Sequence, residues 1–240
     1  MNNSPKSNVQ PKTKEELLAL IEAEINRHGD QCDLNHIDVS LVTNFRHLFV
    51  KSKFNGDISR WDVSGATNMY AMFSNSKFNG DISKWDVSGV YDFDFMFHRS
   101  KFNGDISKWN VSSVKYMRQV FFESEFNGDI SQWNVSGVTN MYCMFAKSKF
   151  DGDISGWDVS SVESVYSMFG SSVFGGDISG WNLSSAEHYN DMFFDSDIAK
   201  KLGVKNPSFE QVKSHFLSLK LEAALQEVSP GQSQASKVRL

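Results

Sequence analysis

The sequence repeats itself with a strict period of 24 residues, and no other feature restricts its fold as strongly. The segment "FNGDISKWDVS" at 78–88 has close copies that begin at residues 54, 102, 126, 150 and 174. All six tryptophans keep the same spacing: Trp61, Trp85, Trp109, Trp133, Trp157 and Trp181. A fixed period between about 20 and 50 residues indicates stacked repeats, in which each unit packs only on its neighbours.

Within one repeat the residue pattern predicts a turn, an extended segment and a short helical turn. Asn-Gly at 55–56 is a turn signal, and the β-branched and aromatic residues of 57–64 favour an extended chain. Met69, Met72 and Phe73 have the i, i+3, i+4 spacing of one helical face. We therefore expect a leucine-rich-repeat-like solenoid with a strand and a short helix in each coil. Coils would stack about 4.7–4.9 Å apart and bury the invariant isoleucine and phenylalanine positions as a core, together with the Met72 position, which changes only to Val120.

The repeats and their flanks divide the chain into segments. Thr13 and Glu16 have capping-box spacing, Leu17 and Ile21 follow at helical spacing, and a second such helix begins near Ser208. We expect both helices to cap the open ends of the stack. The predicted segments are a disordered N-terminus at 1–12, an N-terminal capping helix at 13–31, a degenerate repeat at 32–53, six full repeats at 54–197, a C-terminal capping helix region at 198–228 and a flexible tail at 229–240.

Composition excludes several classes of protein. The 240 residues carry a formal net charge of -5, which does not favour a direct nucleic-acid partner, because phosphate binding needs an excess of Lys and Arg on one face. The two cysteines, Cys32 and Cys143, form no disulfide framework and have no metal-ligand spacing. The N-terminal residues show no conventional signal peptide and the sequence no membrane span. We expect a cytoplasmic protein, or one exported without a conventional signal peptide, and no membrane partner.

An aspartate recurs in every repeat, at the position of Asp57. Neighbouring carboxylates about 5 Å apart repel each other, so the fold must offset that cost. The favoured interpretation is that each carboxylate accepts backbone N–H groups in its own corner, and the alternative is a ladder of cation sites. Serines recur beside this position without a base, and the histidines share no repeat position. We therefore expect no catalytic residues, no cofactor and no metal, and hence no enzyme.

The repeat unit resembles a known family. The pattern F-N-x-D-I-S-x-W-D-V-S-x-V-T-x-M-x-x-M-F, which 54–73 and 126–145 follow closely, is similar to the repeats of the BspA-like leucine-rich-repeat proteins of bacteria. The resemblance covers about 32–197. It implies a leucine-rich-repeat-like fold, and members of that family are often surface proteins thought to mediate adhesion or host contact.

The variable positions carry the functional information, because the invariant ones are assigned to the core. Tyrosine and arginine are favoured at protein interfaces, and several stand at positions that we expect to face outward. The leading hypothesis is a scaffold, monomeric or weakly dimeric, that binds another protein. Surface adhesion is one alternative, and an acidic mimic that inhibits a nucleic-acid-binding protein is another. The candidate partner-binding residues are Tyr70, Tyr91, Phe95, Tyr116, Arg118, Tyr142 and Tyr166.

Overall fold

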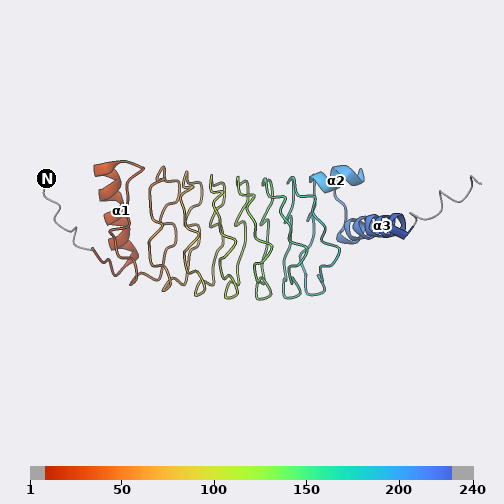
Figure 1. Ribbon diagram of the computed structural model, residues 1–240, viewed down its shortest axis with the longest axis horizontal. Helices are drawn as coiled ribbons and strands as arrows, with labels where there is room; N and C mark the ends of the chain where they lie inside the picture. The colour runs from red at the N-terminus through yellow and green to blue at the C-terminus, as the bar shows by residue number, and fades with distance from the viewer. Residues whose placement is uncertain (1–8, 229–240) are drawn as a thin grey trace, which may run out of the picture.

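The computed structural model describes residues 9–228, which form a stack of coils closed by helices at both ends (Figure 1). Helix α1 (Lys14–His28) precedes the stack, and α2 (Asp197–Leu202) and α3 (Phe209–Val228) follow it. We number the coils from zero (32–53) to six (174–197), so that coil one is 54–77. A position of the repeat is named after its residue in coil one. The predicted disordered N-terminus and flexible tail fall largely on 1–8 and 229–240, outside the described residues.

The predicted leucine-rich-repeat-like fold is wrong. Between 9 and 228 the structure contains three helices and no strand, and no coil has a strand and helix of its own. Neighbouring coils are joined by isolated parallel bridges, one of them at the Asn68 position of each successive pair. Within coil one, turns closed by the Trp61 N–H on the Ile58 carbonyl and by the Ala66 N–H on the Val63 carbonyl interrupt the segment predicted to be extended.

Left-handed residues explain why the predicted helical turn does not form. Ala71 and Asn75 have φ values of 52° and 57°, and the same two positions are left-handed in every coil from zero to six. An α-helix of L-residues cannot continue through such a conformation. The segment instead forms successive tight turns, in which the N–H groups of Met72 and Ser74 bond to carbonyls three residues earlier.

The intervening N–H groups join each coil to the next. The N–H groups of Ala71, Phe73 and Asn75 donate to carbonyls of coil two, with N···O distances of 2.8, 2.9 and 2.7 Å. Donors therefore alternate between the coil itself and its neighbour, and this satisfies the buried backbone without a regular sheet. Because the pattern recurs in each coil, equivalent residues stand above one another along the stack.

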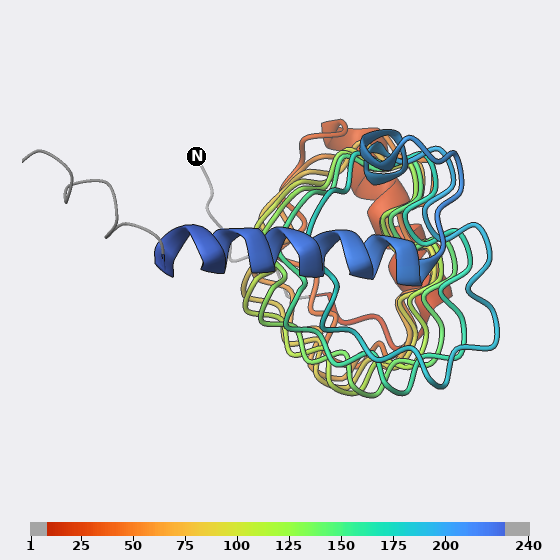
Figure 2. The same cartoon turned by 90° about the vertical axis from the view of Figure 1, so that its right-hand side faces the viewer.

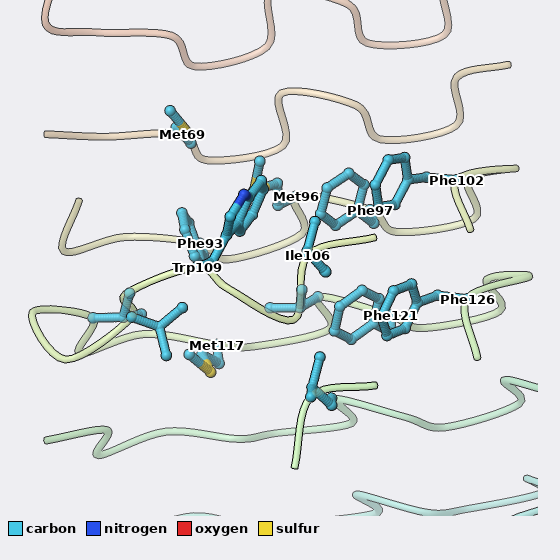
Figure 3. Close-up of a cluster of buried hydrophobic side chains, with 14 of the residues drawn as sticks. Met69, Phe93, Met96, Phe97, Phe102, Ile106, Trp109, Met117, Phe121 and Phe126 are labelled. Carbon is cyan, nitrogen blue, oxygen red and sulfur yellow. The ribbon is translucent and has the colours of Figure 1, made fainter. Parts of the chain in front are cut away.

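Aromatic ladders fill the interior (Figure 3). Phe121 is fully buried, and its ring stacks on those of Phe97 and Phe145 in the adjacent coils at centroid distances of 5.8 and 5.7 Å. Each tryptophan also donates its indole N–H to a buried carbonyl of the preceding coil, as Trp133 does to Ile106 at 3.1 Å. The core positions expected from the sequence are thus buried, although the backbone that holds them is different.

Polar ladders line the corner of each coil. The Asn103 side-chain oxygen accepts the Asn127 N–H of the next coil at 2.8 Å, and the same bond recurs along the Asn55 position up to Gly175. At the Asp57 position, each carboxylate from coil one to coil six accepts the N–H of the serine two residues later. Glycine is required between these two positions, because a Cβ at Gly80 would lie 2.8 Å from the Phe78 ring.

The two ends of the stack are covered differently. At the N-terminal end, α1 is capped by the Thr13 side chain and buries Leu17 and Ile21, while Val9 pairs with Ile37 of coil zero. At the other end, α3 crosses the last coil and extends past it (Figure 2). Val212 is 1% exposed against the core, whereas Leu221 is 62% exposed. Only the N-terminal part of α3 therefore acts as a cap.

Candidate functional site

A shallow groove of about 470 Å³ crosses coils two to six on the outer face of the stack. Its walls come from three neighbouring positions of the repeat, those of Asn68, Tyr70 and Ala71. The tight turns described above place these positions on the outside, because the residues between them point into the core. The lining residues are Phe95, Arg118, Gln119, Asn140, Tyr142, Ser164, Tyr166 and His188.

Stacked rings order the aromatic part of the groove. Tyr142 and Tyr166 occupy the same position in adjacent coils, and their rings stack at 5.4 Å with an interplanar angle of 8°. The Tyr166 hydroxyl donates to the Asp191 carboxylate at 3.1 Å, and this bond raises the pKa of Tyr166. The stack and the hydrogen bond restrict the conformational freedom of both side chains, so ordering them further would cost little entropy.

An ion pair closes one side of the groove. Arg118 donates through Nε and Nη2 to Asp94 Oδ2, both at 2.6 Å, and its backbone N–H donates to Asp94 Oδ1. Burial raises the pKa of Asp94, and the hydrogen bonds from Arg118 oppose that rise. The pKa of Arg118 is raised in turn, chiefly by the same hydrogen bonds. A buried Asp94 carboxylate without a cationic partner would carry a large desolvation cost. The ion pair offsets that cost and holds the Arg118 side chain in place.

The structure brings four of the seven predicted residues into the groove: Phe95, Arg118, Tyr142 and Tyr166. Tyr70 lies beside them, between His47 and Phe95, at ring distances of 5.1 and 5.4 Å.

The other two predicted residues are exposed on the same face but do not line the groove. Tyr116 is 43% exposed and takes part in two of the bridges between coils, with Asp92 and with Asn140. The Tyr91 hydroxyl accepts a hydrogen bond from the Asn68 side chain at 3.3 Å.

Sequence reasoning missed the polar half of the groove. Asn140, Ser164 and His188 share the Asn68 position, and Gln119 shares the left-handed Ala71 position. The variation at the Asn68 position, which also holds Asp92 and Tyr116, was the available signal. We expected Tyr70 and its equivalents to be exposed because of helical geometry. They are exposed instead because of the tight turns.

The recurring carboxylates have a structural role, as the favoured interpretation proposed. Hydrogen bonds from the backbone N–H of the following serines lower the pKa of Asp81, Asp105, Asp129 and Asp153 below the ordinary aspartate value. Across the described part of the chain, no group of three or more His, Cys, Asp or Glu side chains is arranged to hold a metal ion. The groove, at other positions of the repeat, presents ring faces, hydroxyls and amides for contact.

Comparison with known proteins identifies one family. A search of curated proteins and a search of solved structures each found no match. The profile of a family described as "Mycoplasma protein of unknown function, DUF285" matches twice, over residues 22–125 and 99–205. The two overlapping matches together span 22–205, which includes all of coils zero to six. The chain therefore belongs to this repeat family, the Mycoplasma proteins of unknown function DUF285.

Proposed function

We propose that the protein is a non-enzymatic scaffold that binds another protein through the groove of coils two to six. The observation that carries the proposal is the stacked pair Tyr142 and Tyr166, with Arg118 fixed beside it. Tyrosine and arginine supply most of the binding energy at protein interfaces, because each combines a large contact area with a polar group. Here they meet in one concave site with their rotamers already ordered.

The polar wall suits a polypeptide partner. Asn140, Ser164 and His188 stand in successive coils, so they offer hydrogen-bonding groups at the coil spacing along one side of the groove. Pockets lined by rings on one side and by a few polar groups on the other fix both the affinity and the orientation of a bound segment.

A second candidate is contact with other cells at a surface, as an adhesin. It is favoured by the sequence resemblance to BspA-like repeat units at 54–73 and 126–145. This role requires export of the protein. The acidic-mimic alternative gains no support, because the carboxylates at the Asp57 position are engaged with their own coils.

The test is capture of proteins from a lysate of the source cell by the wild-type chain and two double variants. Tyr142→Ala with Tyr166→Ala removes the stacked pair, and we expect a loss of about thirtyfold or more in affinity for any captured protein. Tyr91→Ala with Tyr116→Ala is the matched control, because it removes two exposed tyrosines from the same face outside the groove. Equal loss in both variants, or loss in neither, would remove the groove as the binding site.

A further inference from the structure

One long edge of the stack is strongly basic, although the chain as a whole is acidic. Seven cations occupy two positions of the repeat, those of Asn75 and Lys77, in coils zero to four, and all seven are exposed. We call this set the basic ridge: Lys51, Lys53, Lys77, Arg99, Lys101, Lys147 and Lys149. Glu123 and Glu125 are the acidic residues at these two positions in the same coils. The ridge therefore carries a net charge of +5 in a chain whose total is -5.

Ion pairs hold the central part of the ridge in line. Glu123 bridges Arg99 and Lys147, on the coils either side of it, at 2.6 and 3.2 Å. Glu125 bridges Lys101 and Lys149 in the same way, at 3.1 and 2.6 Å. Each glutamate thus neutralises one of two cations and aligns both.

The N-terminal part of the ridge has no such partners. Among the described residues, no carboxylate lies within ion-pair distance of Lys51, Lys53 or Lys77, and all three are exposed. Three neighbouring like charges are costly in an isolated protein at low ionic strength. Their arrangement favours contact with an anionic partner.

The ridge runs along the edge of the stack from which α2 continues. Asp197, the first residue of α2, occupies the Lys77 position of coil six, and α2 lies at the upper edge of the stack in Figure 1. No ridge residue lines the groove or either of two further pockets of the described chain. Exposed apolar side chains also lie at these or adjacent positions, namely Val50, Val173 and Phe194.

We propose that the basic ridge docks the protein on the anionic lipid headgroups of a membrane surface. A row of exposed cations along one edge can meet several phosphates of a membrane surface simultaneously, and each Lys or Arg near such a surface adds to the attraction. Val50, exposed beside Lys51, suits the headgroup boundary. No helix among residues 9–228 is long and apolar enough to span a bilayer, so the contact is peripheral.

A single-stranded nucleic acid fits the ridge less well. Proteins that bind such strands use a basic groove with open aromatic faces on which bases stack. The aromatic side chain nearest the ridge centre, Phe122, is covered by Arg99 and Lys147, which lie 5.7 and 5.6 Å from its ring centroid.

Among the described residues, the carboxylates in ion-pair contact with the ridge are Glu123 and Glu125, which are already counted in its net charge. At physiological ionic strength charges separated by more than about 8 Å are largely screened from each other. The sequence-based expectation of no membrane contact rested on the absence of a membrane span. The basic edge forms only when the coils stack in register, so a search for membrane spans does not detect it.

The test compares two triple variants of the full chain on vesicles of phosphatidylcholine, with and without phosphatidylserine, by sedimentation. Lys51→Gln, Lys53→Gln and Lys77→Gln together should weaken binding to the phosphatidylserine vesicles about a hundredfold, since each cation contributes about fivefold. The matched control is Arg60→Gln, Lys84→Gln and Lys108→Gln, which makes the same change in net charge at another position of the repeat. We expect this control to lose about twofold at most, because screening limits charges away from the surface.

Three results would overturn the proposal. One is an equal loss of vesicle binding in the two triple variants, which would show that only the net charge of the chain matters. Another is equal binding of the wild-type chain to vesicles with and without phosphatidylserine. The third is tighter binding of single-stranded DNA than of the anionic vesicles at the same salt concentration, which would replace the membrane by a nucleic acid. None of these results bears on the groove, whose residues all variants retain.

Discussion

Replacing Phe121 by alanine tests whether the interior of the stack is one continuous core. Phe121 is fully buried in coil three, and its ring stacks on rings of three neighbours, with centroid distances of 5.8 Å to Phe97, 5.7 Å to Phe145 and 4.3 Å to Phe126. The variant removes the ring from the middle of a ladder that runs through both adjacent coils.

The expected cost is about 3–5 kcal/mol of unfolding free energy, the range measured for buried phenylalanine-to-alanine changes. We expect a value in the upper half of this range, because the cavity cannot collapse easily. Phe97 and Phe145 are held at the coil spacing by backbone bonds, such as that from the Phe121 N–H to the Met144 carbonyl at 3.0 Å. The cost of a cavity grows with the volume that relaxation leaves empty.

The matched control is Phe122→Ala, the next residue in the chain. Phe122 is partly exposed and packs beneath Arg99 and Lys147, so its removal costs weak cation–π contacts of about 0.5–1 kcal/mol. Urea unfolding is followed by circular dichroism and by tryptophan fluorescence together, because a stack of repeats can unfold in parts. Equal unfolding free energies for the two alanine variants would refute the assignment of Phe121 to the core.

Four further predictions concern the polar ladders and the ends. Asn103→Ala should cost about 1–3 kcal/mol in urea unfolding because the Asn127 N–H loses its acceptor, whereas Asn103→Asp should cost much less, since Asp151 fills the same role; equal costs would contradict this. The melting temperature should fall as the pH drops below about 4. The aspartates at the Asp57 position have a lower pKa in the folded chain than in the unfolded chain, so their stabilising contribution is complete above the unfolded pKa and is lost as the pH falls through the folded pKa. Changing four of these aspartates to Asn should flatten the fall in melting temperature at low pH, and an unchanged fall would refute their role. The four are Asp81, Asp105, Asp129 and Asp153. Chelators should leave the melting temperature unchanged, and a drop restored by calcium would show cation sites. Deleting 207–240 should uncover the last coil and produce oligomers in light scattering, while Leu221→Asp, which lies outside the cap, should leave the chain's assembly state unchanged.

The repeat period made the core and the ends predictable from the sequence. Strict recurrence of the Phe73 and Trp61 positions identifies buried residues whatever the backbone between them, because only the spacing and the stacking enter the argument. Capping chemistry placed a helix within 13–31, and α1 spans Lys14–His28. The residues that begin and end a helix act on neighbouring residues of the chain, so their effect does not depend on the fold of the repeat.

The backbone of the repeat could not be predicted in the same way. The i, i+3, i+4 spacing of Met69, Met72 and Phe73 fits one face of a helix, and it fits consecutive turns with a left-handed residue between them equally well. Glycine and asparagine usually mark left-handed positions, yet here the Ala71 and Asn75 positions hold many other residue types. Gln119, in the polar half of the groove, was missed for the same reason, since it occupies a left-handed position with a φ of 53°.

Those left-handed positions connect the fold to both proposals. Fourteen residues other than glycine have φ values between 50° and 62°, two in each coil from zero to six. For L-residues this conformation costs roughly 1–2 kcal/mol each, and glycine would adopt it without the steric penalty. Yet at the Ala71 position the chain places Phe95 and Gln119, which line the groove, and at the Asn75 position it places Lys51 and Arg99, which belong to the basic ridge. That these four side chains are kept at a conformational cost on the surface of the stack favours roles in contact with other molecules.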